Sequence, residues 1–232
     1  MALRPVEKRQ RVVVARPPVH LVDPWRPCVH SRTHFGYEFA KRVCDITLGG
    51  ALLIALLPVA LLAAAAVALS TRANPIYVQK RLGHLGREIT VIKIRTMCPG
   101  ADQLVPFALN ETDGPTFKAR NDPRVTTVGH WLRKFSIDEL PQLLSVVAGT
   151  MSLVGPRPPF AREVAAYRPS QRHRLCVKPG LTGLWQVSGR SDIPFPKWMA
   201  LDRLYVQKRS LLLDGWLIVM TPLAILTARG AR

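Results

Sequence analysis

The feature that most limits how this chain folds is a long apolar segment near its N-terminus. After Asp45 the chain carries no charged side chain until Arg72, and the run from Leu48 to Leu69 is almost wholly apolar. About 20 such residues are enough for a helix to cross a bilayer. The segment therefore predicts membrane association, either as a spanning helix or as a hairpin that enters and leaves on one side.

Two details favour the hairpin, although length alone favours a spanning helix. Basic residues flank both ends of the segment, with Lys41 and Arg42 before it and Arg72 after it. Cytoplasmic flanks carry the excess of Lys and Arg, so matching flanks suit a segment whose ends share one side. Pro58 lies near the middle, where it removes a helix hydrogen bond and kinks the chain. We therefore expect a re-entrant helix–break–helix over residues 39–72.

The charge balance indicates a polyanionic partner. The chain has 33 Lys and Arg against 15 Asp and Glu, a net charge of +18. Nucleic acid, anionic lipid and phosphorylated substrates all suit such a charge. A hydrophobic content of 48% favours a membrane over a soluble nucleic-acid complex, and no nucleic-acid recognition motif is found. We expect anionic membrane lipids as partners and no nucleic acid.

The ends of the chain have distinct compositions. Residues 1–38 form an arm rich in Arg and Pro, which we expect to be mostly disordered and attracted to anionic headgroups. Residues 194–227 contain Trp198 and Trp216 between apolar stretches, which favours amphipathic helices at the membrane interface. The four cysteines show no paired metal spacing, which predicts free thiols.

A second pattern predicts two strands joined by a turn between Asn74 and Met97. Lys93 and Arg95 alternate with Ile92 and Ile94, so the cations share one strand face. That face either lines a phosphate site or is simply solvated, and the pattern does not decide between the two.

Asp138 and Glu139 are adjacent acids on a chain poor in acids. The apolar spacing from Leu140 to Ala148 predicts a helix that begins beside them. Ser136 and Glu139 fit a capping box, while Pro141 in the first turn makes Asp138 itself an alternative cap. Either position favours ionised carboxylates, because the first turn presents unpaired N–H groups.

These acids have two interpretations. They either cap a helix and do nothing more, or they serve as a nucleophile and a metal ligand in a cationic cleft. Cations that could line such a cleft recur along the chain. Arg124 follows a turn, Arg157 is held between prolines, and Gly189-Arg190 ends a glycine-rich stretch that also contains Trp185 as a stacking face.

Taken together, these motifs resemble the bacterial sugar transferase family, which are small monotopic phosphoglycosyl transferases. The resemblance covers residues 39–232 and its C-terminal portion looks most like the galactose-1-phosphate transferases that initiate exopolysaccharide synthesis. The motifs that carry it are Lys41-Arg42-x-x-Asp45, Lys93-Ile-Arg95-Thr-Met97, Asp122-Pro-Arg124-Val-Thr, Ser136-Ile-Asp138-Glu139-Leu-Pro-Gln-Leu, Met151-Ser-Leu-Val-Gly-Pro-Arg157-Pro and Lys178-Pro-Gly-Leu-Thr-Gly-Leu-Trp-Gln-Val-Ser-Gly-Arg190.

The resemblance implies an α/β (α+β) membrane-associated domain. A re-entrant helix over 39–72 would carry a cytoplasmic catalytic domain over 73–232, with interfacial amphipathic helices around it. The enzyme would lie on the cytoplasmic face of the bacterial inner membrane, with a homodimer as one possible state. Two positions depart from the common pattern: Ile94 stands where Phe is frequent, and Leu57 where Ser often precedes the proline. Leu57 bears on the helix break, because Ser can bond freed backbone groups.

The resemblance also implies a reaction. Family members transfer a sugar-1-phosphate from a UDP-sugar to undecaprenyl phosphate and release UMP, through a covalent aspartyl-phosphosugar intermediate. Asp138 would be the nucleophile, and Glu139 would bind Mg2+ or work as an acid–base, with Asp138 as a second metal ligand. Phosphate and nucleotide contacts would come from Arg157, Lys93, Arg95, Arg124, Gly189 and Arg190.

Alternatives remain at two levels. The donor could be UDP-galactose, UDP-glucose or a UDP-N-acetylated amino sugar, and we expect galactose. A different class of protein, a basic membrane-surface scaffold without chemistry, would also explain the charge and the apolar segment. A scaffold has no need of the acid pair, Arg157 and the glycine-rich stretch together, so we favour the enzyme.

Overall fold

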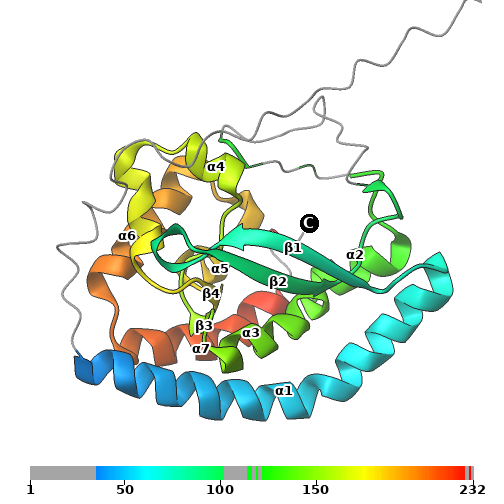
Figure 1. Cartoon of the computed structure of the whole chain (residues 1–232), viewed down its shortest axis with the longest axis horizontal. Coiled ribbons are helices and arrows are strands. Elements are labelled where there is room, and N and C mark those ends of the chain that lie inside the picture. Colours follow the sequence, from blue (N-terminus) through cyan, green and yellow to red (C-terminus); the bar gives the residue numbers. More distant parts are fainter. Residues whose placement is uncertain (1–34, 102–113, 117–118, 120–121, 228–229, 231–232) are drawn as a thin grey trace, which may run out of the picture.

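The computed structural model describes residues 35–101, 114–116, 119, 122–227 and 230. Within them, helices and strands are mixed. The strands form two small sheets, and helices α1, α3, α6 and α7 surround them (Figure 1). The predicted mixed class is confirmed, while the predicted N-terminal arm lies almost wholly outside the described residues.

Helix α1, Phe35–Thr71, runs along one edge of the molecule and bends in its second half (Figure 1). It is the only helix in the described part of the chain that is long and apolar enough to cross a membrane, judged by length and composition. Many of its apolar side chains are exposed, including Ile54 and Leu62. Such a surface is compatible with membrane association.

The predicted interruption of this helix is not observed. The helix continues through Pro58 to Thr71, and it begins at Phe35, before the expected start of the hairpin. Proline inside a helix removes one hydrogen bond and bends the axis, and the turns on each side can keep their own bonds. That both ends of α1 lie on the same side of a membrane stays a prediction.

The first part of α1 is fixed to the rest of the molecule by its polar motif. Arg42 donates to the carbonyls of Val146 and Val147, at distances of 2.8 and 2.7 Å. Oδ1 of Asp45 accepts from the Ser152 hydroxyl at 3.0 Å and from the Leu153 N–H at 2.8 Å. Arg42 thereby caps the C-terminal end of α3, where the last carbonyls have no partner within the helix, and Asp45 fixes α1 to β3.

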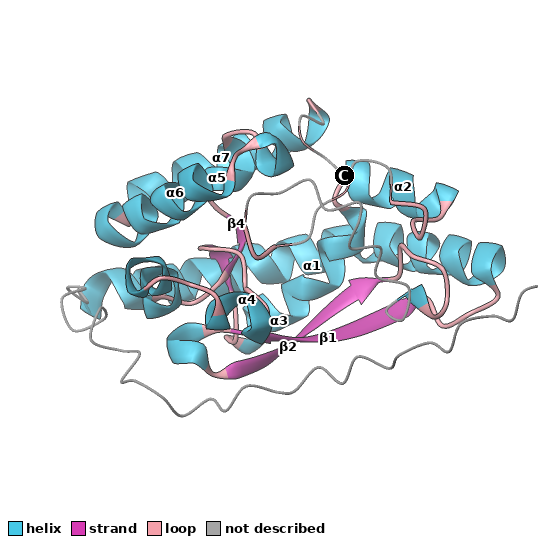
Figure 2. Cartoon of the chain, turned by 90° about the horizontal axis from the view of Figure 1, so that it is seen from above, coloured by secondary structure: helices cyan, strands magenta, loops and turns pink. Residues whose placement is uncertain are grey.

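Strands β1, Ile76–Leu82, and β2, Glu88–Ile94, pair antiparallel around a short 3₁₀ turn, His84–Gly86. The predicted strand–turn–strand is therefore confirmed. A second, parallel pair joins β3, Ser152–Val154, to β4, Gly180–Thr182. Figure 2 shows the β1–β2 ribbon on one side of the molecule and helices α5 to α7 on the other.

The remaining helices are short, apart from α6 and α7. They are α2 (Thr127–Lys134), η5 (Ile137–Gln142), α3 (Leu143–Ala148), α4 (Ala161–Ala165), η6 (Pro169–Cys176), α5 (Leu184–Val187), η7 (Arg190–Asp192), α6 (Phe195–Lys208) and α7 (Leu211–Leu226). Those labelled η are 3₁₀ helices.

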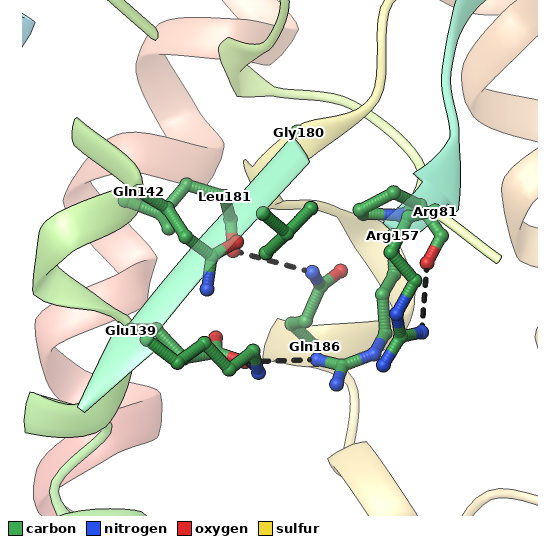
Figure 3. A pocket seen from close by; sticks show the side chains of 10 residues that line it. Arg81, Glu139, Gln142, Arg157, Gly180, Leu181 and Gln186 are labelled. Carbon is green, nitrogen blue, oxygen red and sulfur yellow. Dashed lines mark hydrogen bonds and ion pairs between the residues drawn. The ribbon is translucent and has the colours of Figure 1, made fainter. Parts of the chain in front are cut away.

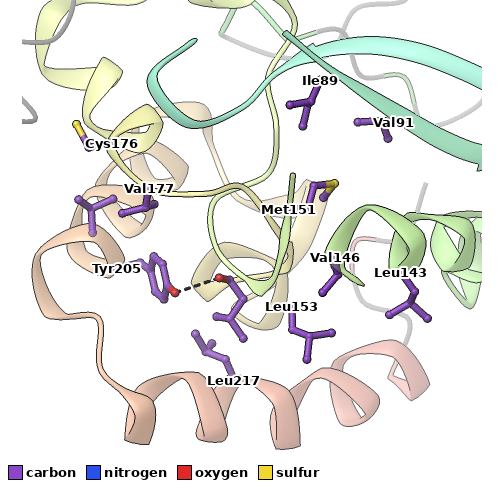
Figure 4. Packing of buried hydrophobic residues seen from close by; sticks show 12 residues of the cluster. Ile89, Val91, Leu143, Val146, Met151, Leu153, Cys176, Val177, Tyr205 and Leu217 are labelled. Carbon is purple, nitrogen blue, oxygen red and sulfur yellow. Dashed lines mark hydrogen bonds between the residues drawn. The ribbon is translucent and has the colours of Figure 1, made fainter. Parts of the chain in front are cut away.

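The main core lies between these layers (Figure 4). Val91 of β2, Val146 of α3, Tyr205 of α6 and Leu217 of α7 are all fully or almost fully buried there. The Tyr205 hydroxyl lies 3.1 Å from the carbonyl of Val154, which satisfies a polar group inside the core. Helices distant in sequence are thereby joined to both small sheets.

Three details of the sequence predictions are corrected. Trp198 is not at the membrane interface but buried, 4.3 Å from the ring of Trp185, so Trp185 is not a free stacking face either. Cys44 and Cys98 are free thiols as predicted, whereas Cys176 is disulfide-bonded. These errors arise because spacing in the sequence does not show which side chains meet in space. Trp216 on α7 is half-exposed, in accord with an interfacial helix.

Candidate active site

The two adjacent acids lie in the first turn of the 3₁₀ helix η5, which leads directly into α3. The chain enters this turn through Ser136, whose φ of 55° is left-handed, and the Ser136 side chain makes no capping bond. The predicted helix start is confirmed, but the predicted capping box is wrong. A residue in the left-handed region does not have the extended backbone that an N-cap side chain requires.

Glu139 is held by two cations from distant segments. Its Oε1 lies 2.5 Å from Nζ of Lys93 and 3.0 Å from Nη1 of Arg157 (Figure 3). Lys93 shares a strand face with the buried residues Ile89 and Val91, so its side chain points into the molecule. The alternative of a solvated cationic face therefore does not apply to Lys93.

Asp138 differs sharply from its neighbour. It is 7% exposed, and its side chain makes no hydrogen bond or ion pair within the described part of the chain. Burial raises the pKa of Asp138 to about 6, with Glu139 adding to the rise and Lys93 and Arg133 opposing it. The helix-end N–H groups were expected to favour the ionised form of both acids, and at Asp138 burial acts against that form.

Glu139 titrates in the opposite direction. Burial opposes its ionisation, but Lys93 and Arg157 outweigh burial and hold its pKa well below the usual range. The pair thus consists of one firmly ionised, clamped carboxylate and one unpartnered carboxylate that ionises near pH 6. Environments that shift the pKa values of two adjacent carboxyl groups in opposite directions are typical of catalytic sites.

A small pocket opens beside Glu139 (Figure 3). Its walls come from β1, β2, η5, β4, α5 and the segment after β3. The residues that line it are Arg81, Val91, Lys93, Glu139, Gln142, Arg157, Pro158, Gly180, Leu181 and Gln186. Three of these are basic and one is acidic, so the pocket suits a ligand with more than one negative charge.

Two amides in this pocket have polar atoms without a protein partner. Nε2 of Gln142 and Oε1 of Gln186 are buried and make no hydrogen bond among the described residues. Buried polar atoms are nearly always bonded, so these atoms are suited to a ligand. The sequence analysis missed both. Gln142 lies three residues after Glu139, and that helical spacing was the one available signal for it.

Arg81 was also missed, and it supports the loop that carries Arg157. Its Nη1 donates to the carbonyl of Pro158 at 3.0 Å, and its guanidinium lies 3.5 Å from the ring centroid of Phe160. Burial lowers the pKa of Arg81 to about 9, with Arg157 contributing. Nothing in the strand pattern of the sequence singles out this arginine.

Two of the predicted phosphate-binding cations do not line the pocket. Arg95 lies one residue beyond the end of β2, and its Nε donates to the carbonyl of Asn74 at 2.7 Å. Arg124 is buried in a bidentate pair with Asp122, with distances of 2.8 and 2.6 Å. Both cations already have protein partners, and each helps to hold a turn.

Gly189 and Arg190 also lie outside the pocket lining, although Arg190 is close enough to be influenced by the charges of the two acids. Both have positive φ, 136° and 50°. Burial lowers the pKa of Arg190, while Glu139 and Asp138 favour its charged form, so the guanidinium lies within electrostatic reach of the two acids. The structure thus brings Lys93 and Arg157 to Glu139, Arg190 near them, and leaves Arg95 and Arg124 apart.

The acids fit a limited role in metal binding. Among the described residues, no group of three or more His, Cys, Asp or Glu side chains could hold a metal ion. Mg2+ is often bound through one or two carboxylates together with water and substrate phosphates, rather than by a protein cage. Asp138 is free for such a contact, and Glu139 uses only Oε1 for its two cations.

This fold and this site define a class of protein, and the comparison with known families agrees. An exposed apolar helix carries a domain with an adjacent carboxylate pair beside a cationic pocket, which Glu139 lines and the buried Asp138 does not. Residues 36–228 match the family described as bacterial sugar transferase. The chain therefore belongs to the bacterial sugar transferase family, and the resemblance drawn from the sequence motifs is confirmed.

Individual relatives are similar along most of the chain. The exopolysaccharide production protein ExoY of Sinorhizobium fredii is 41% identical over 199 residues, which cover 83% of this chain and 88% of that protein. The UDP-galactose-lipid carrier transferase of Erwinia amylovora is 39% identical, over 84% of this chain and 42% of its own length. The undecaprenyl-phosphate galactose phosphotransferase of Salmonella typhimurium is 39% identical, over 67% of this chain and 34% of its own.

Proposed function

We propose that this protein transfers a sugar-1-phosphate from a UDP-sugar to undecaprenyl phosphate, releases UMP and so initiates an exopolysaccharide. Family membership and the names of its relatives support the reaction class. The observation that carries the assignment to a site is the contrast between the two acids. Asp138 has no side-chain partner in the part of the chain that the structure describes, whereas Glu139 is held by two cations.

Asp138 is the nucleophile in this proposal. A carboxylate oxygen of Asp138 attacks the phosphorus that bears the sugar, and the bond from that phosphorus to the bridging oxygen breaks. UMP leaves with the bonding electron pair, and the sugar phosphate is held on Asp138 as an acyl phosphate. With a pKa of about 6, Asp138 is mostly ionised at neutral pH and so needs no separate base.

The second step regenerates the carboxylate. A phosphate oxygen of undecaprenyl phosphate attacks the same phosphorus, and the bond to Asp138 breaks. The product is undecaprenyl diphospho-sugar, and Asp138 is again an ionised carboxylate. Two displacements at one phosphorus leave the number of bonds unchanged, and water is not a reactant.

The surrounding cations offset the repulsion between a carboxylate and a diphosphate. Arg157, the more exposed of the two cations, is suited to a bidentate phosphate contact, and Lys93 adds positive charge beside the acids. Glu139 orients these two cations through Oε1. When bound, Mg2+ would be held by Asp138 or Glu139 together with diphosphate oxygens, and would neutralise further charge.

Several finer assignments belong to the same proposal. Arg190 with Gly189 would contact the nucleotide. Arg95 and Arg124 would contribute positive charge around the site without contacting the substrate. Helix α1 would lie as a re-entrant helix in the inner membrane, with the catalytic domain on the cytoplasmic face. Galactose is our first choice of sugar, because two relatives are named for galactose transfer. Glucose is the second choice, because a Komagataeibacter xylinus relative, 37% identical, is named an undecaprenyl-phosphate glucose phosphotransferase.

The decisive experiment measures UMP release by the full chain held in nanodiscs. UDP-galactose, UDP-glucose and UDP-N-acetylated sugars would be offered with Mg2+, with and without undecaprenyl phosphate. We expect steady release only with the lipid, and one sugar preferred. Without lipid, a donor labelled in the sugar phosphate should label the protein once. No release with any donor would contradict the enzyme and favour the scaffold.

A further inference from the structure

A second pocket lies apart from the carboxylate pair, where the start of α1 meets the end of α6 and the segment before β4. Four of its lining residues are cationic, Lys41, Arg42, Lys178 and Arg209, and two are acidic, Glu38 and Asp45. None of these residues takes part in the proposed reaction. The pocket therefore needs an explanation of its own.

Most of these charges already have partners. Lys41 pairs with Asp214 at 2.8 Å, and Arg42 donates to two carbonyls at the end of α3. Asp45 accepts from β3, and Glu38 lies 2.5 Å from Nη1 of Arg209. These partners bind α1 to the domain, and with four cationic and two acidic residues the lining of the pocket is net positive.

The unsatisfied hydrogen-bond donor of this pocket belongs to a cation, Arg209. The side chain of Arg209 is only 9% exposed, and its Nη2 is buried with no hydrogen-bond partner in the described part of the chain. Lys178 is exposed and forms no ion pair with a described residue. A buried guanidinium N–H without an acceptor is costly, so an anionic acceptor that enters the pocket would stabilise it.

The surroundings of the pocket indicate which anion. Phe39, next to Glu38, is 64% exposed, and Leu212, three residues after Arg209, is 86% exposed. Both belong to helices that present apolar side chains to the outside, α1 and α7. Exposed apolar side chains on the helices around the pocket, together with an unsatisfied cation in it, fit a molecule that carries a phosphate and acyl chains together.

We propose that this pocket binds the phosphate of an anionic bilayer phospholipid, with Arg209 and Lys178 as its contacts and acyl chains along Phe39 and Leu212. The bound lipid would hold the beginning of α1 and the α6–α7 junction at headgroup depth. This site is distinct from the one proposed for catalysis, and its test needs no catalytic activity.

The test counts retained lipids on the full chain by native mass spectrometry, after release from nanodiscs of phosphatidylcholine and phosphatidylglycerol. We expect one phosphatidylglycerol to be retained in preference to phosphatidylcholine. Arg209→Gln should weaken its retention about tenfold, because a charge-assisted contact is lost. Lys208→Gln removes the same charge from the exposed neighbouring residue and should change little. Arg209→Lys should keep part of the affinity.

A variant that is expected to change lipid binding in the opposite direction sharpens this test. Glu38→Gln removes the acid that pairs with Arg209 and should tighten lipid binding. Equal losses for Arg209→Gln and Lys208→Gln would instead show attraction to the overall charge, and would overturn the site. Weaker binding by Glu38→Gln would do the same.

Two further measurements use the unchanged protein and need no variant. A phosphatidylglycerol with a photoreactive acyl chain should label the peptides that contain Phe39 and Leu212, and labels elsewhere would contradict the proposal. Inorganic phosphate in lipid-free detergent should not protect Lys178 from amine modification, whereas phosphatidylglycerol should. Equal protection by phosphate would make the pocket a site for a free anion and would overturn the lipid.

Discussion

Asp138 and Asp214 are both buried carboxylates beside cations, yet their environments are opposite. Asp138 is 7% exposed and Asp214 is 6% exposed. Asp214 has three partners, the hydroxyls of Tyr37 and Tyr205 and Nζ of Lys41, each at 2.8 Å. The side chain of Asp138 has none among the described residues.

This difference separates a structural acid from a reactive one. A buried charge with several hydrogen bonds stabilises a fold, because its desolvation is offset by its partners. Asp214 joins the start of α1 to α6 in this way. A buried charge without partners costs stability, and such a cost is characteristic of functional sites. In the proposed reaction, Asp138 would gain its partner from the bound substrate.

The largest expected effect is that of Asp138→Asn on the rate. The amide is a far weaker nucleophile, so we expect turnover to fall at least about a thousandfold. The thermal unfolding temperature should stay the same or rise, because an unpaired buried charge is removed. UMP release and differential scanning fluorimetry would measure the two. A rate close to that of the unchanged protein would remove Asp138 from the mechanism.

Asp214→Asn should show the reverse pattern. Breaking a buried ion pair by removal of one partner costs roughly 3–5 kcal/mol, so this variant should unfold much more easily. The rate per folded molecule should stay near that of the unchanged protein. Denaturant unfolding in detergent, with UMP release normalised to the folded fraction, would test this. If stability is unchanged while the rate collapses, the division between the two acids is wrong.

Glu139→Gln should have a smaller effect than Asp138→Asn. Lys93 and Arg157 lose their shared acceptor charge, and their positions relax, so we expect turnover to fall about a hundredfold. The matched control is Glu88→Gln, which changes an exposed acid of the β1–β2 hairpin that carries Lys93 and should be neutral. Steady-state kinetics of both variants would separate them. An equal loss in both would indicate that net charge, not position, is responsible.

The smallest effect is the pH dependence of the first half-reaction. Because the pKa of Asp138 is raised to about 6, the nucleophile is lost as pH falls through 6, and the rate should then drop about tenfold per unit. Protein labelling by the donor without lipid avoids titration of the acceptor phosphate. A profile that is flat down to pH 5 would mean that another charge holds Asp138 ionised. Glu139, whose pKa is lowered, should contribute no inflection in this range.

Much of the local structure could be predicted from the sequence. The apolar run, the strand–turn–strand and the helix start at the acids all depend on patterns within a few residues. The error at Ser136 shows the limit of such patterns. A capping motif states which bonds are available, whereas the left-handed backbone at Ser136 follows from how η5 is seated between α1 and β2.

The site itself was predictable in part. Lys93 and Arg157 were named from the sequence and do meet at Glu139, but Arg95, two residues from Lys93, turns away to a backbone carbonyl. The reason is that β2 ends at Ile94, so the alternation does not continue to Arg95. Gln186 entered the pocket from a segment with no local signal for it.

The sequence alone determined the family to which this chain belongs, and it predicted a membrane and an anionic partner. Its apolar helix, its excess of cations and its ordered motifs are properties of composition and spacing, which exist before folding. Only the tertiary structure decided that Asp138 has no partner among the described residues, that Lys93 and Arg157 hold Glu139, and that Arg209 borders a second pocket. Those outcomes depend on burial and on contacts between distant segments, and burial is what sets the energy of a charge.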